Sequence, residues 1–355
     1  MAHPDSSGAP RARRVTIVDV ARHAGVSTAA VSKVLRNAYG VSDSMRERVL
    51  HSMEQLEYRP HRPARGMRGR TYTVGMLVSD IENPFFDLLS DGAIGALAAS
   101  GYELLIAPGG YLASEQVAAV EALIDHQMDG LILVAPVISR DDLERLARAV
   151  PVVVVGQHGG SDLLDTVAGD DHLGAAAVVD HLVELGHERI VFVANHREQA
   201  DSLRPESVRL EGFLEAMRRH GLSDSAVVID GSWSMDGGRD AAHAIEALDP
   251  RPTAVHAGAD VVAFGVLSAW WDDGLRVPRD FSLVGYDNSR TSSIGPISLT
   301  TVDQSGREMG ARAGELLLER IAGRTDAAHE LLEPRLIPRA TTARIAVPVQ
   351  DTTGE

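Results

Sequence analysis

The chain contains no cysteine among its 355 residues, and this absence removes several kinds of chemistry at once. Disulfide bonds, thiolate metal sites and cysteine nucleophiles are all excluded. The 14 histidines do not occur in pairs at metal-ligand spacing beside a matching acid, so we predict neither a metal nor a cofactor. Lys33 is the single lysine among 34 basic residues, a bias that we attribute to coding composition.

Long apolar runs are also missing. No segment approaches the roughly 18 consecutive apolar residues of a membrane-spanning helix. The first residues, MAHPDSSGAPRARR, lack the apolar core of a signal peptide. We therefore expect a cytoplasmic protein with no membrane partner. A GxSxG elbow, an assignable acid pair and a nucleotide-binding glycine loop are absent as well, so we predict no catalytic residues and no enzyme activity.

Charge is distributed unevenly along the chain. Residues 1–70 hold 13 Lys and Arg against 6 Asp and Glu, whereas the remaining 285 residues hold 21 against 44. A basic segment attached to an acidic body indicates that the basic segment binds nucleic acid phosphates. The length exceeds that of most single domains, so we expect two or three domains.

The basic segment predicts three short helices. Ile17, Val20, Ala21 and Ala24 form one apolar stripe, and Thr16 with Asp19 gives a capping pair at its start. Gly25 supplies the backbone freedom of a tight turn.

A second helix follows Ser27, a favourable N-cap, and directs Val31, Val34 and Leu35 inward. A third begins near Ser42 or Ser44. This spacing is typical of a helix-turn-helix unit, which we place at residues 15–60; the alternative is a small protein-interaction module.

The acidic body alternates apolar runs with helical patterns. The runs are rich in Val, Ile and Leu and lie at 73–80, 102–108, 130–137, 151–156, 189–195, 226–231, 253–258 and 281–287. Continuous apolar strands joined by amphipathic helices indicate parallel sheets covered on both faces, which is the doubly wound α/β arrangement.

These segments together resemble the LacI/GalR family of transcriptional regulators. The resemblance rests on VTIVDVARHAGVSTAAVSKVLRN, VSDSMRERV and LEYRPHRPAR, then on TVGMLVSDIENPFF, VDHLVELGHERIVFV, SVRLEGF, DFSLVGYDN, SLTTVDQ and LLEPRLIPRATT in that order. It implies an α/β fold with an N-terminal helix-turn-helix head and a periplasmic-binding-protein-like core of two doubly wound subdomains at 72–345. We expect an N-subdomain at about 72–168 and 304–332 and a C-subdomain at about 169–303 and 333–345, between disordered tails at 1–14 and 346–355.

The resemblance also assigns roles in DNA binding. It implies that Thr28, Ala29 and Lys33 choose bases, while Thr16, Ser27, Ser32, Ser42 and Tyr58 position the DNA backbone. Residues 61–71 correspond to a hinge that becomes helical on DNA, with Met67 as an apolar wedge in the minor groove and Ala64 beside it. Gly66 disfavours helix, so we expect this hinge to be weakly helical without DNA; a plain flexible tether is the alternative.

A small-molecule site is implied as well. Asp80, Asn83, Phe85 and Phe86 follow the first strand, where open α/β sheets bind ligands. By resemblance Arg209, Trp233 and Asp287 line the effector cleft, together with Asp260. Gln157 is a further candidate, next to a position where the family often has Asp. Ala259 and Gly156 replace polar residues that are common in the family. Either the ligand has fewer hydroxyl groups than a hexose, or Gln157, Asp170 and Gln304 supply the missing hydrogen bonds.

The resulting prediction is a sequence-specific, nucleoid-associated repressor of carbohydrate-utilisation genes. We expect a homodimer that binds a pseudo-palindromic double-stranded operator and releases it when a sugar or sugar derivative binds. The alternatives are a corepressor-dependent repressor or an activator of the same build, a free solute-binding protein, and a sugar-processing enzyme with a DNA-binding head.

Overall fold

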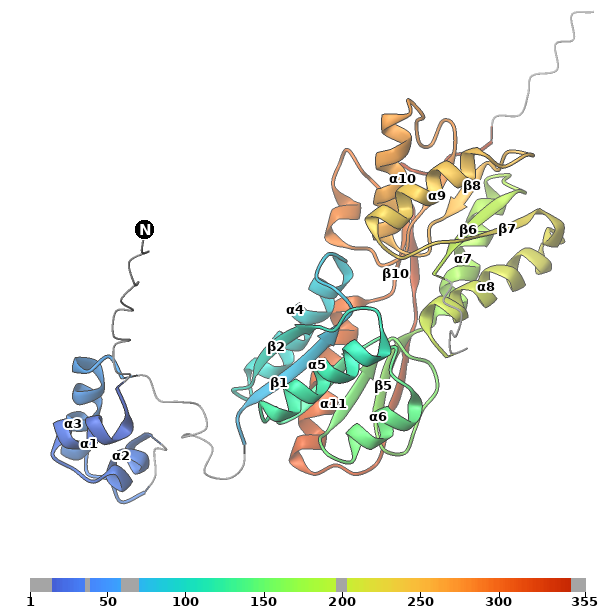
Figure 1. Ribbon diagram of the computed structural model, residues 1–355. Coiled ribbons are helices and arrows are strands. Elements are labelled where there is room, and N and C mark those ends of the chain that lie inside the picture. Colours follow the sequence, from blue (N-terminus) through green and yellow to red (C-terminus); the bar gives the residue numbers. More distant parts are fainter. Residues whose placement is uncertain (1–14, 36–38, 59–69, 196–202, 346–355) are drawn as a thin grey trace, which may run out of the picture. The chain divides into compact units, whose positions relative to one another are not determined.

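The computed structural model describes residues 15–35, 39–58, 70–195 and 203–345. The chain divides into two compact units, Met1–Thr71 and Tyr72–Glu355, which we call the head and the core (Figure 1). The predicted tails at 1–14 and 346–355 and nearly all of the predicted hinge, including Ala64 and Met67, lie outside the described residues.

The head is built from α1 (Ile17–Ala24), α2 (Thr28–Leu35) and α3 (Asp43–Gln55). The Asp19 carboxylate accepts hydrogen bonds from the backbone nitrogen and hydroxyl of Thr16, at 2.9 and 2.7 Å, which confirms the predicted capping pair. Gly25 ends α1 with φ 65° and ψ 36°, a left-handed conformation that glycine adopts without strain. Apolar side chains from all three helices, among them Val20, Val31 and Val49, close a small core.

The core contains two parallel sheets. The first has the order β11-β5-β4-β3-β1-β2 and the second the order β7-β6-β8-β9. The first sheet comprises β1 (Thr73–Val78), β2 (Glu103–Pro108), β3 (Gly130–Val134), β4 (Val152–Val155), β5 (Asp165–Gly169) and β11 (His329–Leu332). The second comprises β6 (Ile190–Ala194), β7 (Ala226–Asp230), β8 (Ala254–His256) and β9 (Ser282–Val284). The predicted doubly wound α/β class is confirmed, and each of the eight predicted strands is present.

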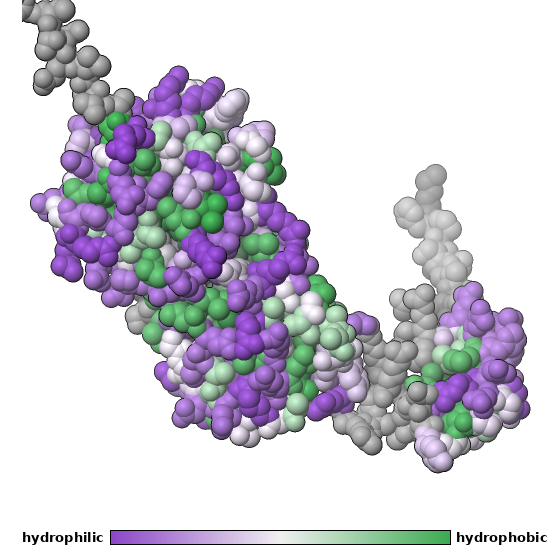
Figure 2. Space-filling view, turned by 180° about the vertical axis from the view of Figure 1, so that it is seen from behind, coloured by the Kyte–Doolittle hydropathy of each residue, from purple (hydrophilic) through white to green (hydrophobic). Residues whose placement is uncertain are grey.

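Helices cover both faces of each sheet because successive side chains of a strand point to opposite faces. The first sheet with its helices forms the N-terminal lobe, and the second sheet with its helices forms the C-terminal lobe. In the N-terminal lobe, α4 (Phe85–Ala98) and α11 (Gly306–Ala322) cover one face, and α5 (Ala113–Asp125) and α6 (Arg140–Ala147) cover the other. In the C-terminal lobe, α7 (Asp171–Glu184) and α8 (Pro205–Arg219) lie opposite α9 (Met235–Glu246) and α10 (Asp260–Asp272). Figure 2 shows polar and apolar residues interspersed on the outer surface of the core unit, Tyr72–Glu355.

Three chain segments connect the lobes. The chain passes from β5 of the first sheet into α7 of the second lobe, and it returns through β10 (Thr301–Asp303) into α11. It passes back a third time from β11 to β12 (Arg335–Ile337), which pairs with β10 in an antiparallel ribbon. Among the helices that the structure describes, none combines the length and apolar character needed to cross a bilayer.

Candidate functional site

The second helix of the head presents a polar surface. Thr28, Ala29 and Lys33 are exposed on α2, and Ser32 is half-buried beside them. The opposite side of α2 buries Val31 and Val34 in the head core, so these four residues face away from it. A surface of small polar groups with one cation suits the edges of bases in a major groove, where hydroxyls and ammonium groups read donors and acceptors.

Four of the five residues predicted to position the DNA backbone lie near helix ends, and the fifth, Ser32, lies within α2. The Ser27 hydroxyl accepts a hydrogen bond from the backbone nitrogen of Ala30 at 3.1 Å, and the Ser42 hydroxyl accepts one from that of Met45 at 3.3 Å. Thr16, Ser27 and Ser42 are exposed. Tyr58 is 8% exposed because its side chain packs in the head core. The N–H groups of the first helical turn that these hydroxyls do not engage can donate to a phosphate.

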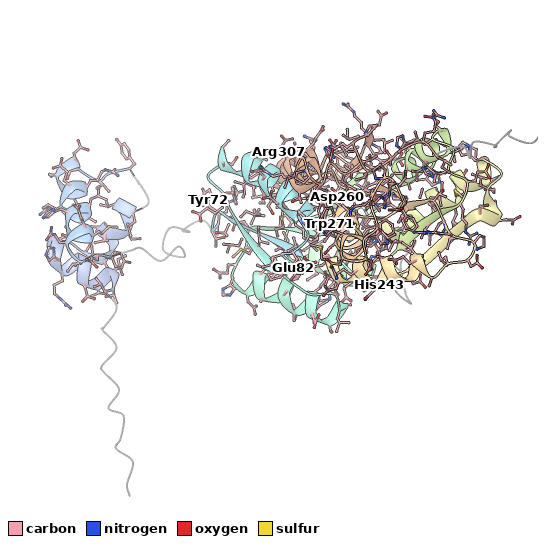
Figure 3. All side chains as sticks on the ribbon, turned by 90° about the horizontal axis from the view of Figure 1, so that it is seen from above. Tyr72, Glu82, His243, Asp260, Trp271 and Arg307 are labelled. Atoms are coloured by element: carbon pink, nitrogen blue, oxygen red, sulfur yellow. The ribbon has the colours of Figure 1, made fainter. Side chains whose placement is uncertain are left out.

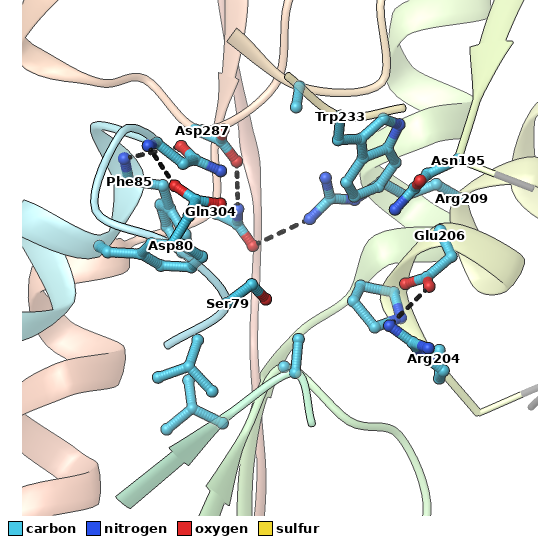
Figure 4. A pocket seen from close by; sticks show the side chains of 18 of the residues that line it. Ser79, Asp80, Phe85, Asn195, Arg204, Glu206, Arg209, Trp233, Asp287 and Gln304 are labelled. Atoms are coloured by element: carbon cyan, nitrogen blue, oxygen red, sulfur yellow. Dashed lines mark hydrogen bonds and ion pairs between the residues drawn. The ribbon is translucent and has the colours of Figure 1, made fainter. Parts of the chain in front are cut away.

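A cavity of about 700 Å³, counted with its opening to solvent, lies between the two lobes of the core (Figure 4). Its walls come from the segments that follow β1 to β4 in one lobe and β6 to β9 in the other, so the carboxyl ends of both parallel sheets face it. The lining residues are Ser79, Asp80, Asn83, Phe85, Phe86, Tyr111, Val134, Ala135, Val155, Gly156, Asn195, Arg204, Pro205, Glu206, Arg209, Trp233, Ala259, Asp287, Gln304 and Met309.

Arg209 occupies the centre of the C-terminal wall and is 3% exposed. Its Nε donates to Oδ1 of Asp171 at 2.6 Å, its Nη1 to the carbonyl of Gly258 at 2.8 Å, and its Nη2 to Oε1 of Gln304 at 3.3 Å. The guanidinium carbon lies 3.7 Å from the ring centre of Tyr286 and 4.8 Å from that of Trp233. Burial alone would lower the pKa of Arg209, but the Asp171 carboxylate raises it above its ordinary value, so the group stays charged.

Asp287 is joined to Arg209 through Gln304. The Gln304 amide nitrogen donates to Oδ1 of Asp287 at 2.6 Å, while its oxygen accepts from Arg209. Asp287 has φ 126°, which is rare for a residue with a side chain. Burial first, and then the charge of Asp260, raise the pKa of Asp287 well above its ordinary range. The neutral form of this carboxyl group is therefore favoured more than in an exposed aspartate, and its oxygens accept from Gln304 and from the backbone nitrogen of Asp260.

The N-terminal wall presents Asp80 and aromatic side chains. Oδ1 of Asp80 accepts from the backbone nitrogens of Glu82 and Asn83, at 2.7 and 2.9 Å, and the Tyr111 hydroxyl donates to Oδ2. Phe85 is 8% exposed and packs in the hydrophobic interior of the N-terminal lobe, whereas Phe86 is half-buried. This wall combines an oriented carboxylate with apolar ring surface.

Asp260 and Gln157, two of the nine predicted effector residues, lie outside the cavity lining. Asp260 begins α10 inside the C-terminal lobe (Figure 3), where its Oδ2 accepts from the hydroxyls of Ser289 and Ser292 at 2.9 and 2.5 Å. Its Oδ1 accepts from the hydroxyl of Thr301 at 2.6 Å. Because its oxygens are engaged by strand β10 and by the segment that follows Asp287, Asp260 holds the segment that carries Asp287. Gln157 lines a separate, smaller recess beneath α6.

Other cavity residues were not expected from the sequence. Tyr111, Asn195, Arg204 and Glu206 come from loops and a helix start whose sequence carries no ligand-binding pattern. The position after a strand is the signal that would have found Tyr111 and Asn195, since both follow strands of the two sheets.

Matches to protein-family models agree with this geometry. Residues 16–61 match the model of bacterial regulatory proteins of the lacI family, and residues 179–342 match that of the periplasmic binding protein-like domain. The HTH-type transcriptional repressor PurR of Vibrio atlanticus is 31% identical over 334 residues, which is 92% of this chain and 98% of that protein.

Solved structures show the same arrangement. The lac repressor dimer bound to operator and the anti-inducer ONPF aligns with a TM-score of 0.75 at 27% identity, covering 93% of this chain and all of that one. A LacI-family regulator from Enterococcus faecium with bound ribose aligns with a TM-score of 0.69 at 28% identity, over 77% of this chain and all of that one.

A helix-turn-helix head followed by a two-lobed periplasmic-binding-protein-like core defines a class of DNA-binding transcriptional regulators. Within that class, the chain belongs to the LacI family of bacterial regulatory proteins. The family, the fold class and the role in DNA-binding transcriptional regulation that the sequence predicted are thereby confirmed.

Proposed function

We propose that this protein is a repressor that binds its operator as a homodimer and releases it when a sugar-like molecule occupies the cavity between the lobes. The observation that carries the proposal is the composition of the cavity. Carboxyl, amide and guanidinium groups from both lobes lie beside the rings of Phe86 and Trp233. Sugars are bound by such polar groups, which pair with their hydroxyls, and by aromatic rings that cover their C–H faces.

The arrangement supports control of DNA binding by the ligand. A molecule that contacts Asp80 on one wall and Arg209 on the other stabilises one relative position of the lobes over others. Residues before Thr73 join the N-terminal lobe to the head, so a change in that lobe alters the spacing of two heads in a dimer. A differential affinity of about 1–3 kcal/mol is enough for useful regulation. The ribose-bound Enterococcus faecium relative supports a sugar as ligand.

Exposed apolar side chains support the homodimer. Leu105 and Ile106 on β2 are 44% and 45% exposed, and Ile94 on α4 is 51% exposed. Strand β2 ends the first sheet, so its outer edge is unpaired within the described chain. Unpaired edges with apolar residues are favourable sites for a second chain. The lac repressor, bound to its operator as a dimer, supports a pseudo-palindromic site and, with it, action on chromosomal DNA in the cytoplasm.

Gel-shift measurement of the full-length protein on its own upstream intergenic DNA, at fixed salt, tests the proposal. We expect a sequence-specific shift that one uncharged sugar abolishes. A shift that appears only when a compound is added would instead establish corepression. A specific complex that switches transcription on in a reconstituted assay would establish activation. Absence of any specific shift would contradict the role in repression.

A further inference from the structure

Two charged side chains on the C-terminal wall stand outside the Arg209 network. Arg204 precedes α8 and Glu206 is the second residue of that helix. Their side chains are 13% and 4% exposed, and Nη2 of Arg204 lies 2.8 Å from Oε1 of Glu206. Both residues line the cavity, and Figure 4 shows them together on the wall opposite Asp80.

The Glu206 carboxylate is incompletely satisfied. Its contact with Arg204 is an ion pair by distance, yet Oε1 accepts no properly directed hydrogen bond from the residues that the structure describes. A buried acceptor left without a donor is energetically costly, and more so when it is charged. Because this oxygen belongs to a cavity wall, a bound molecule that donates to it removes this cost.

The pair offers an acceptor and a donor side by side. A hydroxyl group both donates and accepts, so two neighbouring hydroxyls match a carboxylate and a guanidinium placed next to each other. A phosphate ester presents mainly acceptor oxygens and negative charge at neutral pH, and it gains nothing from Glu206.

The rest of the wall opposes an anion as well. Each arginine among the described lining residues already faces a carboxylate, Arg209 that of Asp171 at 2.6 Å and Arg204 that of Glu206. Asp80 adds a further carboxylate on the opposite wall. An entering phosphate would have to compete with buried carboxylates for each of these cations.

We propose that Arg204 and Glu206 form a hydroxyl-binding pair that selects an uncharged sugar and excludes its phosphate ester. This inference rests on the proposed sugar-responsive function and assigns the chemical class of the effector. Arg204 donates to one hydroxyl oxygen, and the adjacent hydroxyl donates to Oε1 of Glu206.

Binding of matched sugar pairs to the full-length protein tests the proposal. The probes are ribose with ribose 5-phosphate, glucose with glucose 6-phosphate, and cellobiose with its 6-phosphate. Affinity is followed by titration calorimetry and by the fluorescence of Trp233, which lines the cavity. We expect the uncharged member of the binding pair to bind at least about tenfold more tightly.

Equal or tighter binding of the phosphate ester would overturn the selection against anions while leaving a sugar-responsive regulator intact. If no sugar and no ester binds while the operator shift persists, the sugar-responsive function fails and the inference fails with it. The two failures are therefore distinguishable, and neither requires a variant to fold.

The variant Glu206→Gln tests whether Glu206 is the residue that selects the uncharged sugar over its phosphate ester. It keeps the shape of the side chain but removes the carboxylate, and with it the negative charge that pairs with Arg204. We expect the uncharged sugar to bind about 10- to 100-fold more weakly and the discrimination against its ester to narrow. Glu211→Gln is the matched control, because Glu211 is exposed on the same helix outside the cavity. Unchanged discrimination in Glu206→Gln, with thermal unfolding like that of the control, would refute the role of Glu206.

Discussion

The guanidinium of Arg209 is held by the buried carboxylate of Asp171, with Nε donating to Oδ1 over 2.6 Å. The other oxygen of Asp171 lies 2.7 Å from Nε2 of His158, which follows β4 in the N-terminal lobe. Asp171, at the start of α7 in the C-terminal lobe, therefore contacts both Arg209 in the cavity wall and His158 of the other lobe. Gln304, next to a segment that connects the lobes, bonds the same guanidinium from another side. The position of Arg209 is thus coupled to the relative position of the lobes.

Replacing Arg209 with lysine tests its role in binding the effector. Lysine keeps the charge but cannot direct three donors at once toward Asp171, Gly258 and Gln304. We expect affinity for the effector to fall at least about tenfold, while operator binding without effector changes little. Calorimetry measures the first quantity and gel shift the second. Arg218→Lys, on the exposed side of the same helix, is the control. An effector affinity equal to that of the control would show that the three-donor geometry of the Arg209 guanidinium is dispensable.

Lys33 provides the corresponding test of the head. Its ammonium group is exposed on α2, where it reaches either a guanine or a phosphate. If Lys33 reads a base, Lys33→Ala weakens operator binding by about 1–3 kcal/mol and affects random duplex much less. Fluorescence anisotropy with both duplexes at two salt concentrations separates the outcomes. Arg48→Ala on α3 removes an equal charge and should leave the ratio of the two affinities unchanged. Loss of affinity in equal proportion for both duplexes would reduce Lys33 to a phosphate contact.

Apolar runs in the sequence located the strands well because parallel strands are buried on both faces. Strand β5 was not predicted, because it begins with the charged residue Asp165 and so does not read as an apolar run, although Asp165 is completely buried. Its carboxylate is neutralised by Arg320 and Arg324, which are more than 150 residues away in the chain. Strands β11 and β12 are short and carry charged residues, so their pattern resembles that of a loop.

The candidate site was partly accessible from the sequence for a related reason. Asp80 and Asp287 follow strands, and the carboxyl ends of parallel strands gather at one edge of a sheet. The Arg204–Glu206 pair lies in SLRPESVRL, whose pattern indicates only a polar helix start. Both residues line a cavity whose opposite wall belongs to the other lobe, and a one-dimensional pattern does not contain that arrangement.

Asp165 gives a stability prediction. Its Oδ2 lies 2.6 Å from Nη2 of Arg324, and its Oδ1 lies 2.9 Å from Nη2 of Arg320. Burial alone would raise the pKa of Asp165, but the two guanidinium groups lower it below the ordinary value. The stabilising effect is therefore present at neutral pH and is lost as pH falls through the lowered pKa.

We expect Asp165→Asn to lower the free energy of unfolding of the core by about 3–5 kcal/mol at neutral pH, since Arg320 loses its carboxylate partner and Arg324 loses the buried one of its two. Urea unfolding followed by tryptophan fluorescence measures this effect, because Trp233, Trp270 and Trp271 all belong to the core. The neighbouring variant Asp162→Asn alters an exposed residue and should have little effect. A loss no larger than that of Asp162→Asn would mean that the ion pairs contribute nothing net.

His256 predicts how stability depends on pH. It is completely buried in the C-terminal lobe, 4.8 Å from the ring centre of Phe192. Neither ring nitrogen has a hydrogen-bond partner among the described residues. Burial, and then the charge of Arg209, lower the pKa of His256 from 6.5 to about 3. The folded state therefore keeps the ring neutral, whereas the unfolded chain takes up a proton below pH 6.5, so stability falls as pH decreases from about 6.5 toward 3.

Replacing His256 with phenylalanine should remove this contribution while keeping an aromatic ring among Phe192, Phe213 and Tyr286. Linkage gives at most about 1.4 kcal/mol per pH unit for one proton, which amounts to about 2 kcal/mol between pH 7 and pH 5. We expect the loss of stability over that interval, measured by urea unfolding, to be smaller in His256→Phe by about this amount. His126→Gln changes an exposed histidine and should retain the dependence of the parent protein. Since other titrating groups are common to the three proteins, an unaltered dependence in His256→Phe would show that His256 is protonated in the folded state.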